Sequence, residues 1–235
     1  MMVKRNTAKY IRKAHRYLGI FLGIQFLLWT ISGIYFSWTN IDEIHGDQFI
    51  KENVQVVHKL SDTNETLSHY KISSLTLHTI ANQPYYWVND SILVHAITGK
   101  TKDIISEAEA KGVVRNYVKD EFQITSVTRI DSVNNHHEYR GRPLPAYAIT
   151  FNHPDNLIAY VSAKDGLFQR VRHKSWRWFD FLWMTHTMDY KSRDDFNTLV
   201  LRGFSLLGLV TVLSGFVLWF VSSPRMIKVF KKRRK

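Results

Sequence analysis

The sequence predicts an α+β protein in which two transmembrane helices flank an extracytoplasmic domain of helix and antiparallel sheet. Two long uncharged runs lie near the ends of the chain, at residues 18–38 and 203–220. All twenty acidic residues lie between Asp42 and Asp195, so both ends carry only basic charges. The stretch between the runs mixes amphipathic segments with short alternating ones, a pattern typical of α+β domains.

The two uncharged runs have the length of membrane-spanning helices. The first holds twenty-one residues without a charge. At the helical rise it covers roughly 30 Å, the thickness of a bilayer's hydrocarbon core. The second holds eighteen and reaches spanning length when residues 199–202 and Val221 are added. We therefore expect transmembrane helices at 18–38 and 199–221. Because Ser37-Trp38-Thr39 is not a small-residue cleavage site, we interpret the first run as a retained anchor rather than a signal peptide.

The charge distribution predicts an orientation. Six Lys or Arg residues precede the first run and seven follow the second. By the positive-inside rule, residues 1–17 and 222–235 are cytoplasmic and the central segment 39–198 lies on the other side. That segment has eighteen basic against twenty acidic residues, so the net charge of +12 resides at the helix ends. There, basic residues orient the chain and contact anionic lipid. We therefore expect the lipid bilayer, and no nucleic acid, as a partner.

Composition also excludes several kinds of chemistry. The chain has no cysteine, which rules out disulfides, thiolate metal sites and cysteine nucleophiles. The central domain must then be held together by its core alone. No glycine-rich phosphate loop, zincin helix or nucleophile elbow occurs. The sequence thus contains no hydrolase signal, and it leaves open whether the protein is an enzyme.

Within the central segment, two stretches have a similar order of expected elements. The first begins with a short helix expected over residues 72–80, followed by strands at 85–88 and 92–96. The second begins with a capping box, Ser106 followed three residues later by Glu109, and a helix with apolar residues at helical spacing. Strands at 124–130, 146–151 and 157–162 follow. Both stretches end in a polar turn with glycine, which suggests two repeats of one helix-plus-sheet unit; a single unit is the alternative.

Four segments resemble the PepSY-associated transmembrane-helix family of bacterial envelopes. Residues 13–20 (KAHRYLGI) are similar to the family's opening of the first helix, and residues 30–33 (TISG) to its small-residue turn. Residues 141–147 and 160–166 resemble PepSY repeats. Residues 176–190, which include Arg177-Trp178 and His186 to Tyr190, resemble the signature that precedes a membrane helix. Residues 213–219 (LSGFVLW) resemble the terminal helix.

The resemblance implies a location and a chemistry. It implies the bacterial inner membrane, a periplasmic PepSY-like domain at 39–198 and an aromatic interfacial segment at 175–196. The better-understood relatives bind haem b between histidines and act in reducing ferric siderophores or in moving electrons across the membrane. Those relatives have four or more membrane helices, whereas this chain has two. We therefore do not expect one copy to hold a complete transmembrane electron path.

The implied iron ligands are His15, His45 and His186, because neutral imidazole is a good axial ligand for haem iron. His15 precedes the first helix on the cytoplasmic side, so a membrane thickness separates it from His186. His45 and His186 both lie near the outer end of a predicted helix, and they are the pair we expect within one copy. His15 would pair with a second copy or another subunit. Arg202, one turn inside the second helix, would partner a haem propionate or an acidic neighbour.

Each of these residues also has a structural interpretation. His186 could be an interfacial histidine bonded to Asp189, His15 a headgroup-level residue and His45 part of a linker. Arg202 could be a snorkelling anchor. Small residues on both helices predict close packing within the chain, in a homodimer or in a larger membrane complex; they are Gly19, Gly23, Gly208, Thr211 and Gly215.

The sequence thus supports two classes of function. The first is haem-linked electron transfer or an accessory role in iron and siderophore handling. The second is a non-enzymatic envelope module that binds a peptide, restrains a peptidase or serves as an accessory subunit of a membrane complex.

Overall fold

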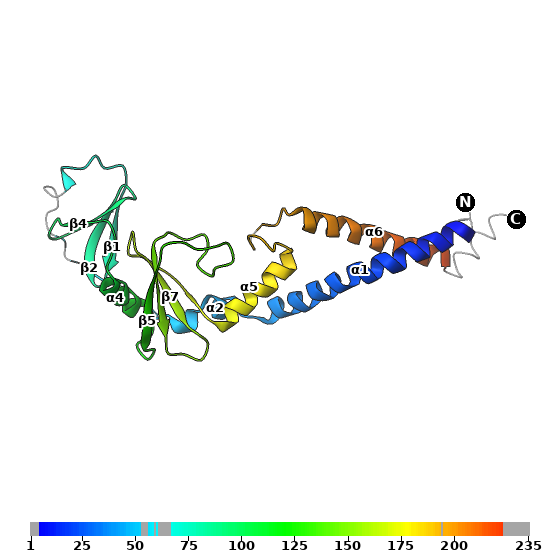
Figure 1. Cartoon of the computed structure of the whole chain (residues 1–235), viewed down its shortest axis with the longest axis horizontal. Helices are drawn as coiled ribbons and strands as arrows, with labels where there is room; N and C mark the ends of the chain where they lie inside the picture. The colour runs from blue at the N-terminus through cyan, green and yellow to red at the C-terminus, as the bar shows by residue number, and fades with distance from the viewer. Residues whose placement is uncertain (1–4, 53–55, 59, 61–66, 194, 223–235) are drawn as a thin grey trace. The chain divides into compact units, whose positions relative to one another are not determined.

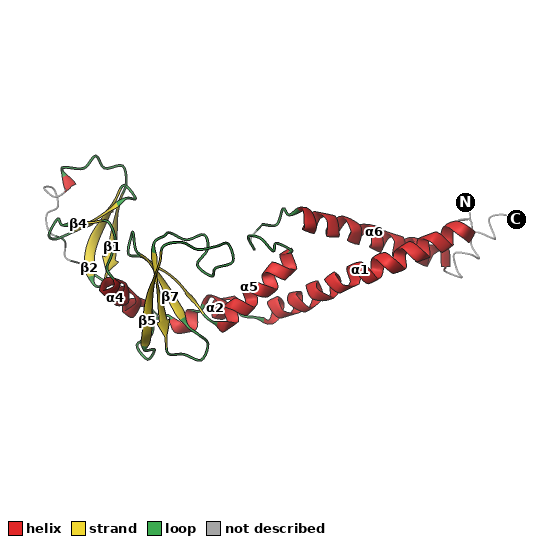
Figure 2. Ribbon diagram, in the orientation of Figure 1, coloured by secondary structure: helices red, strands yellow, loops and turns green. Residues whose placement is uncertain are grey.

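The computed structural model describes residues 5–52, 56–58, 60, 67–193 and 195–222. The basic tail predicted after residue 222, and Lys4 at the other end, lie outside the described residues. The chain forms two compact units, here called the helical unit (Met1–Trp38 with Phe181–Lys235) and the sheet unit (Thr39–Asp180). The second boundary falls inside a helix, so the aromatic segment expected at 175–196 is divided between the units. Figures 1 and 2 show the order of the elements.

The helical unit is built on two long apolar helices, α1 (Arg5–Trp38) and α6 (Leu199–Ser222). Within them, Lys9–Trp38 and Leu199–Phe220 are long and apolar enough to cross a membrane. Most of their apolar side chains are not covered by protein: Leu27 is 60% exposed and Leu206 is 64% exposed. A helix in the core of a soluble protein would bury such residues. The two helices therefore suit an apolar surrounding, as the sequence predicted.

Where α1 and α6 meet, large side chains of α1 pack against small residues of α6. A Cβ atom at Gly208 would lie 3.0 Å from Cζ of Phe26, and one at Gly215 would lie 3.4 Å from Cε1 of His15. The rings of Phe21 and Phe204 also stack, with centroids 5.4 Å apart. By contrast, nothing lies within 4 Å of a Cβ placed at Gly19 or Gly23. The close packing predicted from small residues is therefore confirmed for α6, and a contact of Gly19 and Gly23 with another copy stays a prediction.

The sheet unit contains two four-stranded antiparallel sheets, each with its strands in sequence order (Figure 2). The first comprises β1 (Leu75–Ile80), β2 (Gln83–Val88), β3 (Ile92–His95) and β4 (Thr101–Lys102). The second comprises β5 (Ile124–Ile130), β6 (Ala146–Phe151), β7 (Ile158–Ser162) and β8 (Phe168–Arg172). This arrangement confirms the predicted α+β class at the level of helix plus antiparallel sheet.

The prediction of a short helix over residues 72–80 is wrong, because residues 75–80 form strand β1. Thr76, Thr79 and Ile80 are β-branched and fit a pleated strand better than a helix. The two residues that follow, Ala81 and Asn82, both have positive φ, 48° and 66°. Two such residues form the tight turn that joins antiparallel strands. Strand β1 therefore pairs with β2 as a hairpin.

One helix, α4 (Glu107–Tyr117), packs between the two sheets and contributes buried residues to the core that they share. Its first turn has the predicted capping box: the Glu109 N–H donates to the Ser106 hydroxyl, and the Ser106 N–H donates to the Glu109 carboxylate at 2.8 Å. Ala110, Val113 and Val114 are buried in one apolar cluster with residues from strands of both sheets. A chain without cysteines thus gains a core by placing one helix against two sheets.

The link from α1 to the sheets passes through α2 (Ile41–His45) and a 3-10 turn, η1 (Asp47–Phe49). Gly46 ends α2 in the left-handed region with φ 94°, and a Cβ there would lie 2.3 Å from Cγ2 of Val171. Next to it, His173 Nε2 lies 3.2 Å from the carbonyl oxygen of Ile44. Gly46 therefore fixes α2 against β8 for two reasons, its backbone conformation and its lack of a side chain.

Replacing Gly46 by Ala should destabilise the sheet unit by about 2 to 4 kcal/mol, because the left-handed backbone and the clash with Val171 add together. Chemical denaturation of the full chain in detergent, followed by tryptophan fluorescence, measures this change. Gly141→Ala is the matched control: Gly141 also has positive φ, 69°, but nothing lies near its Cβ position. An equal loss in both variants would contradict the role of the contact with Val171.

Glu109 should make the stability of the sheet unit depend on acid pH. Burial alone would raise its pKa, but the hydrogen bonds from Lys102 and Ser106 outweigh burial and lower the pKa below its ordinary 4.5. Its stabilising effect is then complete above pH 4.5 and is lost as the pH falls through the folded-state pKa. Glu109→Gln should remove about 1 kcal/mol at neutral pH and flatten the acid limb of an unfolding-against-pH curve.

Glu107→Gln serves as the control for this measurement, since Glu107 makes only an exposed ion pair with Lys111. If both variants kept the acid limb of the wild type, the contribution of Glu109 would be refuted.

Candidate functional site

The candidate site lies in the helical unit, whose two histidines are His15 on α1 and His186 at the end of α5 (Lys174–Thr187). Both were predicted as iron ligands. The structure places each of them against a serine on a neighbouring helix. The details of these two contacts decide which ring nitrogen carries a proton.

His186 is held by Ser32 of α1. Its Nδ1 lies 2.7 Å from Oγ of Ser32, whose residue is only 2% exposed. The Ser32 hydroxyl donates its single proton to the carbonyl oxygen of Leu28, at 2.7 Å. With its proton on this carbonyl, Ser32 Oγ acts as an acceptor towards the imidazole, and from this pattern we infer that Nδ1 of His186 is the protonated nitrogen. The lone pair of His186 is then on Nε2.

The backbone around His186 is held by two further side chains of α1. Trp29 Nε1 donates to the carbonyl oxygen of His186 at 2.7 Å, and Gln25 Nε2 donates to that of Thr185 at 3.4 Å. The Phe36 ring stands edge-on to the imidazole, with centroids 5.5 Å apart. These carbonyls belong to the last turn of α5, where no intrahelical donor follows. The end of α5 is thus bonded to α1, and the imidazole has a defined orientation.

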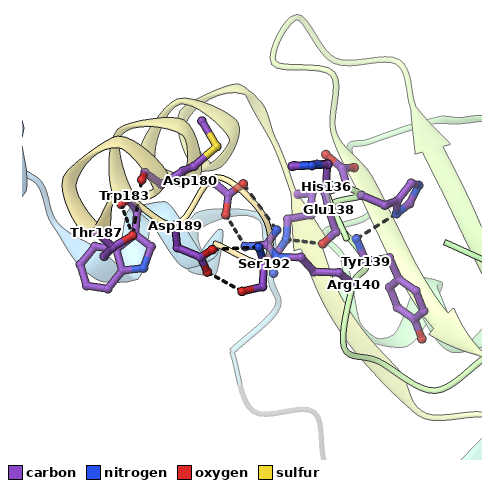
Figure 3. Close-up of polar contacts among 12 residues, drawn as sticks. His136, Glu138, Tyr139, Arg140, Asp180, Trp183, Thr187, Asp189 and Ser192 are labelled. Atoms are coloured by element: carbon purple, nitrogen blue, oxygen red, sulfur yellow. Dashed lines mark hydrogen bonds and ion pairs between the residues drawn. The ribbon is translucent and has the colours of Figure 1, made fainter. Parts of the chain in front are cut away.

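Directly after His186, the chain turns out of α5 around Asp189. Met188 has φ 54°, which ends the helix. The Asp189 carboxylate accepts from the N–H groups of Lys191, Ser192 and Asp195, and from the Ser192 hydroxyl (Figure 3). Burial acts to raise the pKa of Asp189, but these hydrogen bonds lower it well below its usual range. Asp189 therefore shapes the loop to α6 as an anion, while the hydrogen bond of His186 goes to Ser32.

His15 has the same arrangement at the other end of α1. Its Nδ1 lies 2.7 Å from Oγ of Ser214, and the Ser214 hydroxyl donates to the carbonyl oxygen of Thr211 at 2.7 Å. By the same reasoning, His15 carries its proton on Nδ1 and its lone pair on Nε2. Gly215 leaves the room for the ring, because its Cβ would lie 3.4 Å from Cε1 of His15.

The two imidazoles belong to separate sites. His15 and Ser32, the partner of His186, are seventeen residues apart on α1, which is about 26 Å along a helix. No single haem can therefore use both as ligands in one copy, in agreement with the depth argument from the sequence.

The other two predicted residues lie elsewhere. His45 is the exposed last residue of α2, in the sheet unit, so its pairing with His186 stays a prediction. The Arg202 guanidinium donates through Nη2 to Oδ1 of Asn197 at 3.3 Å, just before α6 begins. Arg202 thus reaches back towards the start of α6, as a snorkelling anchor does. Among the described residues of the helical unit, the structure gives no hydrogen bond between any two of His15, His186 and Arg202.

At each of the two histidines, the imidazole and its hydrogen-bond partner fit the role of one axial ligand to haem iron. A histidine that ligates a metal usually donates its other ring N–H to a fixed acceptor, as His15 and His186 do to serine. Each site offers one imidazole, so a second axial ligand would come from His45 in the case of His186, or from another copy or subunit. Within the described residues, no group of three His, Cys, Asp or Glu side chains is placed to hold a metal ion.

Sequence reasoning missed the residues that hold the imidazoles: Ser32, Ser214, Trp29 and Gln25. A signal for two of them was present. Ser32 and Ser214 lie in the segments 30–33 and 213–219 that carry the family resemblance, where they were interpreted only as part of a small-residue turn and of the terminal helix. Their pairing with histidines needed the relative rotation of three helices, which the periodicity of one helix does not contain.

Comparison with known proteins adds no assignment: no family model, curated protein or solved structure matches the chain. The PepSY-associated resemblance therefore remains a prediction that depends on the segments quoted above.

The tautomers can be tested by nitrogen-15 NMR of histidine-labelled full-length protein. Resonances typical of a protonated Nδ1 are expected for His15 and His186. Ser32→Ala removes the acceptor of His186, so the ring should lose this single tautomer while that of His15 is unchanged. Ser37→Ala is the control, because Ser37 bonds only to the carbonyl of Ile34. A protonated Nε2 on His186 in the wild type would refute the assignment.

Proposed function

We propose that the protein is an inner-membrane protein of the PepSY-associated type that takes part in haem-b-linked electron transfer, or in an accessory step of iron and siderophore handling. The observation that carries the proposal is the shared geometry of His15 and His186. Each ring donates Nδ1–H to a serine on a neighbouring helix and keeps its Nε2 lone pair for another atom.

This geometry supports a ligand role better than a purely structural one. A histidine that only packs between helices needs one hydrogen bond, and either ring nitrogen could make it. Here each serine hydroxyl also lies 2.7 Å from a helix carbonyl oxygen, which favours its role as an acceptor from the imidazole. Neutral imidazole with a free Nε2 is the form that binds iron. A haem b bound at such a site would supply reversible one-electron chemistry at its iron.

Within this proposal, the remaining side chains orient and shield the imidazole. Trp29 and Gln25 fix the backbone of the last turn of α5, and Phe36 covers the ring of His186. Since each site has one histidine, we propose that a homodimer or a larger membrane complex supplies the second ligand. Gly19 and Gly23, which have no neighbour at their Cβ positions, offer a face of α1 for close helix packing.

The proposed location follows from charge and hydropathy. With basic residues outside both apolar helices, the two termini would be cytoplasmic and the sheet unit periplasmic. The absence of cysteine is compatible with an oxidising periplasm, since the sheet unit needs no disulfide.

A non-enzymatic binding module is the second candidate function. It is favoured by a cluster of arginines in the sheet unit, in which the buried Arg172 forms no ion pair with a carboxylate of the described residues. In this case the apolar helices would anchor a domain that binds an envelope ligand or an accessory subunit.

Absorption spectra of the purified full chain test the haem proposal. After expression with added haem, the wild type should show a Soret band and, when reduced with dithionite, b-type peaks. His186→Ala or His15→Ala should abolish or shift these bands, because each removes the Nε2 donor. His136→Ala, an exposed loop residue, should leave the spectrum unchanged. A colourless wild type, or bands that survive both substitutions, would refute the proposal and favour the binding module.

A further inference from the structure

The sheet unit contains a buried cluster of charged side chains at one edge of its second sheet. The cluster joins β8, the loop that follows β5 and the first turns of α5. At its centre, the Glu138 carboxylate accepts from Arg177 Nε at 2.6 Å, from Arg177 Nη2 at 3.0 Å and from the Tyr160 hydroxyl at 2.6 Å. Nearby, Arg140 Nη2 donates to Oδ1 of Asp180 at 2.6 Å; Figure 3 shows Glu138, Arg140 and Asp180. Both carboxylates are therefore engaged by arginines.

Arg172 is the exception in this cluster. It is only 4% exposed. Its guanidinium bonds to backbone carbonyls alone, Nε to Glu138 at 3.3 Å and Nη1 to Val171 at 3.1 Å. Its Nη2 makes no hydrogen bond to the part of the chain that the structure describes. The flat guanidinium group lies over the Trp176 ring, with Cζ 3.8 Å from the centroid. A charge this deeply buried normally has a carboxylate partner.

Arg172 remains a cation at neutral pH. Burial is the largest cause acting on its pKa, and Arg140 and Arg142 act in the same direction, so that the pKa falls to about 10 in spite of Glu138 and Asp180. Arg140 and Arg177 each pair with one of the two carboxylates, Asp180 and Glu138, and Arg172 adds a further guanidinium group. One positive charge, that of Arg172, is therefore left in excess among these side chains.

Arg170 adds a second, independent observation. It lies two residues before Arg172 on β8, and alternate residues of a strand project from the same face. Its Nε is buried and has no hydrogen-bond partner among the described residues. Each of these two arginines of β8 therefore has a guanidinium N–H group without an acceptor among the described residues, at Nε of Arg170 and at Nη2 of Arg172.

We propose that Arg172, with Arg142 and the Trp176 ring, forms a binding site for a phosphate group, presented by the headgroup of an anionic phospholipid. A phosphate oxygen would accept from Nη2 of Arg172, and the exposed Arg142 would complete the contact. Guanidinium groups match the geometry of phosphate oxygens, and one anion offsets the excess positive charge.

The choice of a lipid source depends on the proposed membrane location. Two residues, Thr39 and Asn40, separate α1 from α2, and α2 packs on β8 through Gly46. If α1 spans a bilayer, the chain enters α2 of the sheet unit two residues beyond the end of that helix. Along α5, Trp178 is 53% exposed and Phe181 is 46% exposed, and exposed aromatic residues are typical of the membrane interface. A soluble phosphate compound would present the same chemistry without the membrane.

Binding of a fluorescent phosphatidylglycerol to the full chain in neutral detergent micelles tests the proposal, with anisotropy as the readout. Unlabelled phosphatidylglycerol should displace the probe and phosphatidylcholine should not. Arg172→Gln should weaken binding at least about tenfold, because it removes a charge-assisted hydrogen bond from a buried site. Arg129→Gln is the matched control: Arg129 lies in the same sheet but is paired with Asp131 on the surface.

Each result decides the proposal. Equal affinity for phosphatidylcholine, or wild-type binding by Arg172→Gln, would overturn it. Displacement of the probe by glycerol phosphate as effective as that by phosphatidylglycerol would support the site and assign it to soluble phosphate compounds. If Arg172→Gln does not fold, the exposed Arg142→Gln decides: about two- to threefold weaker binding supports the site, and unchanged binding overturns it. The assay needs no haem, so a colourless protein that binds the lipid would refute only the haem proposal.

Discussion

The need to satisfy polar groups on two largely apolar helices determines how the helical unit is assembled. Where helices expose aliphatic side chains to their surroundings, an unbonded polar group on their inner faces costs several kcal/mol. In this protein Gln25, Trp29 and Ser32 of α1 all bond to the last turn of α5, and His15 bonds to Ser214 of α6. These few contacts set the rotation of each helix about its axis. The same contacts leave two imidazole lone pairs without a partner, so the constraint that builds the unit also produces its candidate sites.

In the sheet unit, the main constraint is to form a core without disulfides. Two four-stranded sheets without disulfides share the core that surrounds α4, and glycines at the closest approaches keep the elements together. Gly112 of α4 lies where a Cβ would be 2.5 Å from that of Ala81, at the tip of the first hairpin. A core divided between two small sheets depends on such contacts more than a single large sheet does, because each sheet alone buries little apolar surface.

The two candidate sites differ in chemistry and in their relation to stability. The imidazoles in the helical unit have hydrogen bonds of their own, so the fold tolerates them without a ligand. Arg172 in the sheet unit is a buried cation that forms no ion pair with a carboxylate of the described residues, which lowers the stability of the unliganded fold. The anion proposed above would offset this cost. The buried charge of Arg172 would therefore favour anion binding to the sheet unit whether or not the helical unit binds haem.

Several elements could be predicted from the sequence because local patterns determine them. Uncharged runs of membrane length became α1 and α6, Ser106 and Glu109 formed the capping box of α4, and the strands at 124–130 and 146–151 formed β5 and β6. Residues 72–80 were misassigned because a short apolar stretch fits helix and strand equally well until its pairing partner is known. Strand β8 was not predicted, since two arginines interrupt its apolar alternation.

By itself, the sequence determined the helices, their caps and the types of residue available for chemistry, because these depend on neighbours a few positions away. The tertiary structure alone decided what each functional residue does. The pairing of His186 with Ser32 joins residues 154 positions apart, and the burial of Arg172 depends on a loop and a helix that close over β8. Contacts of this separation follow from the packing of whole elements, and no local pattern records them.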